Sequence, residues 1–152
     1  MNHEPKPSIS PFVILGVCFL GFAAIYLWRG GWAGGGGGAE KVAWQTNLDA
    51  ARAQAARDKK PLVVYFTASW CGPCQRMKGT TFADQTVADE LAAKFIAVKI
   101  DTDAQPDVAG QFNVSGIPHI QILRADGTPG PAHVGFISAT ELIQWLRGSG
   151  VQ

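Results

Sequence analysis

The sequence predicts an α/β fold in which helices cover a sheet. Runs rich in β-branched and aromatic residues, of which Leu62-Val63-Val64-Tyr65-Phe66 is the clearest, alternate with segments of helical pattern. Such alternation is typical of domains whose helices pack on the faces of a sheet. The 152 residues suffice for one domain with its own core plus an appendage, and no internal repeat is present.

Local start and stop signals place the elements in order. Asn47 and Ser138 are typical helix N-caps, and Ala125-Asp126-Gly127 predicts a hairpin turn. A break near Gly79-Thr80-Thr81 divides the helical segment that follows Cys74. The predicted strands cover residues 61–67, 96–101, 117–123 and 132–136, and the predicted helices cover 48–57, the turns after Cys74, 84–95, 105–112 and the stretch after Ser138.

Apolar side chains along these elements define the expected core. The last helix carries four of them on one face, as a helix packed against a sheet requires. Large aromatic residues elsewhere in the chain are also expected to be buried. The expected core residues are Trp44, Phe66, Phe95, Phe112, Leu142, Ile143, Trp145 and Leu146.

Charge and cysteine content exclude two classes of protein. Lysine and arginine number 13 against 12 aspartate and glutamate, so the formal net charge of +1 gives no reason to expect a nucleic-acid partner. Three cysteines are too few for a disulfide-built scaffold. The compartment cannot be inferred from the cysteines.

The first 41 residues predict three segments that precede a domain over 42–149. Residues 1–11 are polar and contain prolines, which predicts disorder. Residues 12–28 carry no charge and come near the lower length limit for a helix that spans a bilayer. Residues 29–41 are mostly glycine and predict a flexible linker that would hold the domain near the membrane.

A single uncleaved transmembrane anchor at 12–28 is preferred over two alternatives. A cleavable signal peptide would have a shorter apolar core and a small-x-small cleavage site. A lipoprotein signal at Leu15-Gly16-Val17-Cys18 is disfavoured by the bulky Val17, so Cys18 is interpreted as a small apolar residue of the span. Lys6 and Arg29 lie on opposite sides of the segment, so they leave its orientation open.

Two cysteines directly after the central strand predict redox chemistry. Cys71 would lie at or just before a helix start, where unpaired N–H groups and the helix dipole favour a thiolate. Cys74 returns to the same face three residues later and can attack a mixed disulfide formed at Cys71. Pro73 suits the first helical turn, where its missing N–H costs little. Cys71 is therefore the expected nucleophile and Cys74 the resolving thiol.

The segment from Val64 to Cys74 resembles the active site of the thioredoxin family, and Ser115-Gly116-Ile117-Pro118 resembles its cis-proline loop. The similarity extends from Trp44 to Arg147. In finer pattern, Lys60-Pro61 and Thr81-Phe82-Ala83-Asp84 resemble the C-terminal domain of the membrane electron transporter DsbD. The resemblance implies a thioredoxin-like fold with a central mixed sheet, thiol–disulfide exchange, and no organic cofactor or metal.

The resemblance also assigns roles around the dithiol. It implies that Pro118 follows a cis peptide bond and that Ile117 offers its backbone to an extended substrate peptide. Trp70 would form an apolar wall beside the nucleophile, and Gly72 and Pro73 would lie at the same substrate-binding surface.

Two further positions qualify the resemblance. The buried acid of the family falls on Tyr65, which cannot accept a proton at neutral pH, so the group that deprotonates Cys74 is left open. The lysine that accompanies that acid falls on Lys99 and would favour a nearby thiolate if it were buried, although a lysine at a strand end is commonly solvated.

His119, directly after Pro118, has two alternative interpretations. It could tune the dithiol, because histidine titrates near neutral pH. It could instead join Cys71 and Cys74 as a ligand for zinc or copper(I), although adjacent strand residues face opposite ways.

The leading functional hypothesis is a membrane-tethered reductase of disulfides in periplasmic or other extracytoplasmic proteins. The DsbD resemblance implies the location, a membrane electron donor of the DsbD type and disulfide-containing protein substrates. Three alternatives stay open: a disulfide oxidase or isomerase, a metallochaperone that uses Cys71, Cys74 and His119, and a noncatalytic docking module.

Overall fold

Four strands form one mixed sheet in the order β2-β1-β3-β4, with β1 in its interior. The computed structural model describes residues 38–151 of the chain. Strand β1 pairs in parallel with β2 and antiparallel with β3, and β3 pairs antiparallel with β4. The strands are β1 (Leu62–Thr67), β2 (Ile96–Asp101), β3 (His119–Leu123) and β4 (Pro129–Val134).

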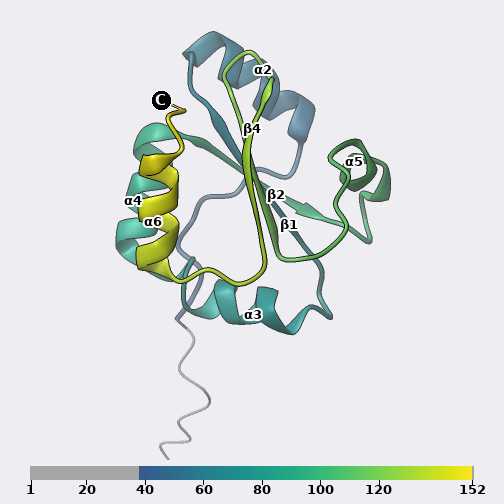
Figure 1. Cartoon of the computed structure of the whole chain (residues 1–152), viewed down its shortest axis with the longest axis vertical. Helices are drawn as coiled ribbons and strands as arrows, with labels where there is room; N and C mark the ends of the chain where they lie inside the picture. The colour runs from purple at the N-terminus through teal and green to yellow at the C-terminus, as the bar shows by residue number, and fades with distance from the viewer. Residues whose placement is uncertain (1–37, 152) are drawn as a thin grey trace, which may run out of the picture. The chain divides into compact units, whose positions relative to one another are not determined.

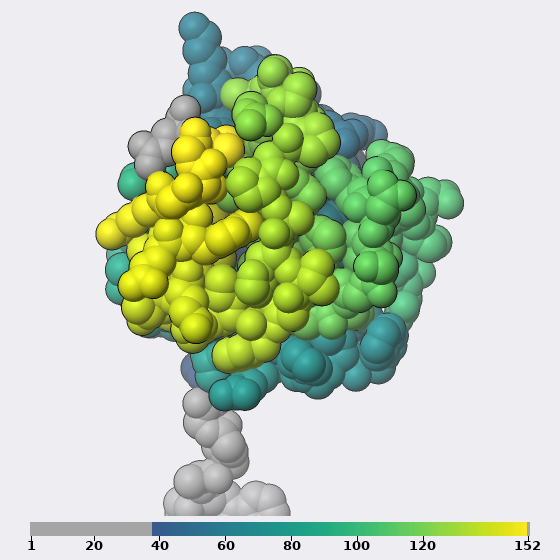
Figure 2. Space-filling model, viewed as in Figure 1, coloured from purple at the N-terminus to yellow at the C-terminus, as the bar shows by residue number. Residues whose placement is uncertain are grey.

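Helices cover both faces of this sheet (Figure 1). One face packs against α3, α4 and α6, and the other packs against α2 and α5. Figure 2 shows the surface from the side of β4 and α6, with α3 along its lower edge. The helices are α2 (Leu48–Asp58), α3 (Gly72–Gly79), α4 (Gln85–Lys94), α5 (Pro106–Gln111) and α6 (Ala139–Gly148).

Alternation along β1 divides the core into two clusters. Val63 and Tyr65 point into the cluster beneath α3, α4 and α6, whereas Val64 and Phe66 point into the cluster beneath α2 and α5. Of the aromatic residues expected in the core, Phe66 and Phe95 are buried, and the other three are half-buried against the two clusters: Trp44, Phe112 and Trp145. On α6, Leu142 and Leu146 are buried, while Ile143 is half-buried.

The predicted capping residues act as expected. Asn47 accepts the backbone N–H of Ala50 at the start of α2. Ser138 and Glu141 form a reciprocal capping box at the start of α6. These side chains satisfy backbone donors that the first turn of each helix leaves free.

Strand β4 lies three residues earlier at its start than the sequence indicates, at Pro129 instead of 132. Prolines at 129 and 131 argue against a strand, but β4 is an edge strand, where a missing backbone donor is tolerated. The pairing of β3 with β4 also shifts register between Gln121 and Leu123. The predicted turn is confirmed: Gly127 has a φ of +85°, which glycine adopts without steric cost.

The chain contacts the domain from Gly38 onward, before residue 42, where composition places the start of the domain. Gly38 N donates to Gly79 O at the end of α3, and Lys41 N donates to Phe82 O, both at 2.8 Å. Beyond this, Gln45 forms a parallel bridge with Val98 at the outer edge of β2. Residues 38–41 therefore belong to the folded unit.

The predicted disordered segment 1–11, the predicted anchor 12–28 and most of the predicted linker 29–41 lie outside the described residues. Between residues 38 and 151, no helix combines the length and apolar character needed to cross a bilayer.

Candidate active site

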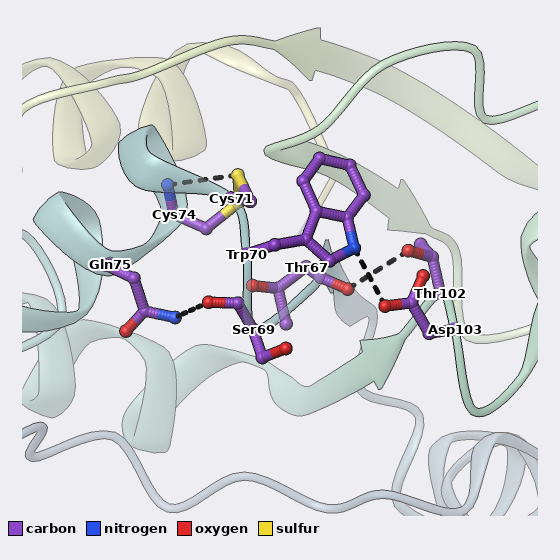
Figure 3. The surroundings of a disulfide bond; sticks show 8 residues. All are labelled: Thr67, Ser69, Trp70, Cys71, Cys74, Gln75, Thr102 and Asp103. Carbon is purple, nitrogen blue, oxygen red and sulfur yellow. Dashed lines mark hydrogen bonds between the residues drawn. A yellow bond between two sulfur atoms is a disulfide. The ribbon is translucent and has the colours of Figure 1, made fainter.

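A disulfide between Cys71 and Cys74 lies at the N-terminus of α3. Cys71 is the N-cap residue, and its Sγ accepts the backbone N–H of Cys74 at 3.2 Å (Figure 3). Cys71 is 3% exposed and Cys74 is 1% exposed. The helix terminus thus directs N–H groups and its positive dipole end at the sulfur of Cys71, which is the environment that favours a thiolate.

Gly72 and Pro73 form the exposed first residues of α3 between the two cysteines. The proline occupies the first helical turn, as its missing N–H predicts. Because both residues are exposed, a protein substrate can approach the disulfide over them.

Trp70 is 69% exposed directly before the disulfide. Its indole extends away from the cysteines, and its Nε1 donates to Asp103 Oδ2 at 2.8 Å, in the loop after β2 (Figure 3). Phe136 is also exposed, and the guanidinium of Arg76 on α3 stacks 4.3 Å from the centre of its ring. The roles of Asp103 and Arg76 in holding these aromatic rings could not be predicted, because each contact joins distant segments of the sequence.

The peptide bond between Ile117 and Pro118 is cis, as the resemblance implied. Pro118 is buried, and its carbonyl oxygen accepts the N–H of Gly135. Ile117 lies just before β3 and packs, half-buried, against both hydrophobic clusters, one of which contains the two cysteines.

Tyr65 occupies the position predicted for an acid and is 2% exposed. Its hydroxyl has no hydrogen-bond partner among the described residues. Its ring packs against Trp44 and Phe82, with centroids 5.6 and 4.7 Å away. Burial raises the pKa of Tyr65 to about 12, so its hydroxyl stays protonated at neutral pH.

Lys99 is not a free surface cation. Its Nζ lies 2.8 Å from Glu40 Oε2, and the other carboxylate oxygen, Oε1, accepts Trp44 Nε1 at 2.6 Å. The Lys99 ammonium also lies 5.8 Å from the centre of the Trp44 ring. Sequence reasoning missed Glu40 because it stands 59 residues from Lys99, inside the predicted flexible linker 29–41, where no fixed contact was expected.

A pocket of about 210 Å³ joins this ion pair to the redox pair. Its lining includes Glu40, Tyr65, Lys99 and the resolving cysteine Cys74. Asp101 and Lys78 supply the remaining charged groups of the lining. Cys74 thus shares one pocket with four charged side chains.

His119 lies on the other face of the sheet. It is 6% exposed, its ring packs edge-on against Phe66 with centroids 5.5 Å apart, and neither ring nitrogen has a hydrogen-bond partner within residues 38–151. Burial lowers the pKa of the His119 imidazole.

The hypothesis that Cys71, Cys74 and His119 together bind a metal ion is therefore wrong. The two cysteines pack into the cluster beneath α3, whereas His119 contacts Phe66 of the opposite cluster. In the part of the chain that the structure describes, no three His, Cys, Asp or Glu side chains are grouped to hold a metal ion.

Comparison with known proteins identifies the family of this site. The sequence model of the family described as thioredoxin-like matches residues 43–125. A thioredoxin-like protein of Synechocystis is 37% identical over 92 residues, which cover 60% of this chain and 84% of that protein. The chloroplast thioredoxin X of Arabidopsis thaliana is 37% identical over 91 residues, 59% of this chain, but the chain spans only about half of its length, 48%.

A solved structure supports the same fold. The oxidised C-terminal domain of DsbD from Neisseria meningitidis superposes with a TM-score of 0.58 and 23% identity, covering 70% of this chain and 99% of that domain. Cys71 and Cys74 form the disulfide of this chain's Cys-X-X-Cys motif, and the chain belongs to the thioredoxin-like family.

Proposed function

We propose that this protein is a membrane-tethered reductase of disulfides in proteins outside the cytoplasm. The observation that carries the proposal is the position of Cys71 as the N-cap of α3, with Cys74 one turn inside the helix. In the reduced protein, the Cys71 thiolate attacks a substrate disulfide and forms a mixed disulfide. Cys74 then attacks Cys71, which releases the reduced substrate and closes the internal disulfide.

The substrate would bind over the exposed surface beside the disulfide. Trp70 and Phe136 offer apolar area there, and Gly72 and Pro73 leave the start of α3 accessible. Ile117 lies just outside the ladder of β3, and its backbone groups would pair with an extended peptide. The cis-proline loop at Pro118 would present those groups. Recognition of main chain in this way suits an enzyme with several protein substrates.

The reducing direction is inferred from the residues between the cysteines. Gly72-Pro73 resembles reducing thioredoxins more than strongly oxidising relatives. Electrons would come from a membrane donor of the DsbD type, a partner suggested by the structural likeness to the DsbD C-terminal domain. A glycine-rich tether after an anchor at 12–28 would raise the effective concentration of the domain at such a donor.

The reduction potential of the Cys71–Cys74 pair tests the direction. The full chain with Cys18→Ser, which leaves only these two thiols, is equilibrated in dithiothreitol or glutathione buffers and the oxidised fraction is read by thiol alkylation. We expect a potential near that of thioredoxin, about −270 mV. A value near that of the oxidant DsbA, about −120 mV, would make the protein an oxidase or isomerase instead.

A further inference from the structure

The thiol of Cys74 must lose its proton before it can attack the mixed disulfide at Cys71. Only a thiolate attacks a disulfide efficiently, and a thiol that is buried in apolar surroundings ionises reluctantly. Cys74 is 1% exposed, so bulk water does not reach its sulfur freely. The proton acceptor must therefore share the pocket that Cys74 lines.

Few groups in that pocket can accept a proton. The ammonium groups of Lys78 and Lys99 are donors, and the Tyr65 hydroxyl stays protonated at neutral pH. Two carboxylates remain, Glu40 and Asp101. Asp101 Oδ1 already accepts the backbone N–H groups of Asp103 and Ala104, at 2.9 and 3.3 Å, and so closes the loop after β2.

Glu40 is the carboxylate that other side chains hold at the pocket, whereas Asp101 accepts its two hydrogen bonds from the backbone of its own loop. Each of its oxygens accepts one hydrogen bond, from Trp44 Nε1 and from Lys99 Nζ, and a carboxylate can accept about four. Its side chain is only 14% exposed, and the Lys99 side chain is 29% exposed. These contacts fix the carboxylate at the pocket, while the volume of about 210 Å³ is large enough for water to connect it to Cys74.

We propose that Glu40 accepts the proton of Cys74 across this pocket when Cys74 resolves a mixed disulfide, and that Lys99 and Trp44 position the carboxylate. This proposal rests on the proposed function and deepens it. It assigns the acceptor to the segment that precedes the first helix of the domain, rather than to β1, where Tyr65 stands.

The step balances as follows. The Cys74 thiol gives its proton to Glu40, and the Cys74 thiolate attacks Cys71 Sγ. The Cys71–Cys74 bond forms as the bond between Cys71 and the substrate sulfur breaks. The substrate leaves as a thiolate and takes a proton from water, and Glu40 later returns its proton to water. Two electrons have then passed from the dithiol to the substrate disulfide.

A two-phase reaction with 5,5′-dithiobis(2-nitrobenzoate) isolates this step. In the reduced full chain with Cys18→Ser, attack by Cys71 releases one coloured thiolate, and resolution by Cys74 releases a second. We expect Glu40→Gln to slow the second phase at least about tenfold at neutral pH and to leave the first phase unchanged. The second phase of Glu40→Gln should also become steeply faster as pH rises, because only hydroxide then replaces the carboxylate.

Two variants provide the controls. Asp101→Asn tests the other carboxylate of the same pocket as the acceptor, and the proposal predicts a second phase that is slowed less than in Glu40→Gln. Glu40→Asp keeps a carboxylate on a shorter side chain and should restore part of the rate, which a purely structural role of Glu40 would not explain.

The sign of the effect separates the proposal from a simple charge effect. A negative charge near Cys74 disfavours its thiolate, so a Glu40 that acted only through its charge would make Glu40→Gln faster. A faster or unchanged second phase in Glu40→Gln, or a slow phase in Asp101→Asn alone, would overturn the proposal. Absence of both phases in the protein with Glu40 intact would instead refute the proposed function.

Discussion

A single buried histidine illustrates how one residue can limit stability. His119 is buried against Phe66, and its two ring nitrogens have no partner within the described part of the chain. A buried polar group without a hydrogen bond costs about 1–3 kcal/mol. Because burial lowers the pKa of His119, the folded protein holds this imidazole neutral at a pH at which the unfolded chain is already protonated.

Replacement of His119 by leucine should therefore change the pH dependence of folding. In the unfolded chain, His119 binds a proton near pH 6.5, whereas in the folded protein it stays neutral to lower pH. The free energy of unfolding is therefore highest above about pH 6.5 and decreases as pH falls below it. We expect His119→Leu to remove this loss, which is limited to about 1.4 kcal/mol per pH unit for one proton. Urea unfolding at pH 7.5 and 5.5 measures it. Equal losses in the two proteins would contradict the assignment.

The residue scale also shows where prediction from sequence stopped. The positions of Cys71, Cys74 and Pro118 follow from local motifs, and the structure places them as expected. The sequence predicts that Tyr65 cannot accept a proton at neutral pH, and in the structure burial raises its pKa to about 12. Glu40 could not be found, because its partners Lys99 and Trp44 are defined only by the folded chain.

At the scale of elements, a charge cluster joins α4 to α6. Glu90 on α4 accepts two hydrogen bonds from Arg147 on α6, at 3.1 and 2.9 Å, and also pairs with Lys94 at 2.9 Å. Hydrogen bonds from Arg147 and Lys94 lower the pKa of Glu90 from 4.5 to about 2. The bidentate geometry makes this a stronger contact than an ordinary surface pair.

Glu90→Gln should lower the free energy of unfolding by about 1 kcal/mol at neutral pH. The loss is small because the Arg147 side chain is 56% exposed and solvent screens its charge interaction with Glu90. With a depressed pKa, the contribution of Glu90 is present above about pH 4.5 and is lost as pH falls toward 2. The free energies of unfolding of Glu90→Gln and of the parent protein should therefore become equal as pH approaches 2.

Asp89→Asn is the matched control, because Asp89 is an exposed carboxylate on the same helix and, within residues 38–151, accepts a hydrogen bond only from Gln85. We expect the free energy of unfolding of Asp89→Asn to exceed that of Glu90→Gln at neutral pH. This difference should shrink as pH falls, as it does for the parent protein. A constant gap between Glu90→Gln and the parent protein down to pH 2 would show that packing, and not the ion pair, accounts for the loss.

Element boundaries were predictable where the local signals were strong. The prediction for β2 was the same as the observed Ile96–Asp101, because a run of apolar residues lies between a helix and a loop. The prediction for β4 was displaced, because its prolines disguise an edge strand. The bridge at Gln45 was missed, since one paired residue leaves no periodic pattern.

At the scale of the whole molecule, the proposed location leads to a topology prediction. If the proposal is right, the domain must be exported while the proposed anchor at 12–28 stays in the membrane. Alkaline phosphatase fused after Gln152 and expressed in a bacterium should be active, because this reporter folds only outside the cytoplasm. The fusion should also stay with membranes during alkaline carbonate extraction. An inactive reporter, or release into the soluble fraction, would refute the corresponding part of the proposal.

The fold as a whole was predictable because alternation, caps and the cysteine motif all indicate the same architecture. The resemblance then supplied the mixed sheet, which is observed. Contacts between distant segments, such as Trp70 with Asp103 and Arg76 with Phe136, depend on loop paths that no local pattern encodes.

The hydrogen bonds from Gly38 to Gly79 and from Lys41 to Phe82 have a mechanical consequence. They connect the first residues of the domain to the end of α3 that lies opposite the cysteines and to the segment that follows it. A force applied through the preceding chain would therefore act on these hydrogen bonds before it acts on the sheet. Glu40 stands between these two fastenings. Tension would therefore separate Glu40 from Lys99 while the four strands stay paired. The proposed proton acceptor would be the first functional group that force displaces.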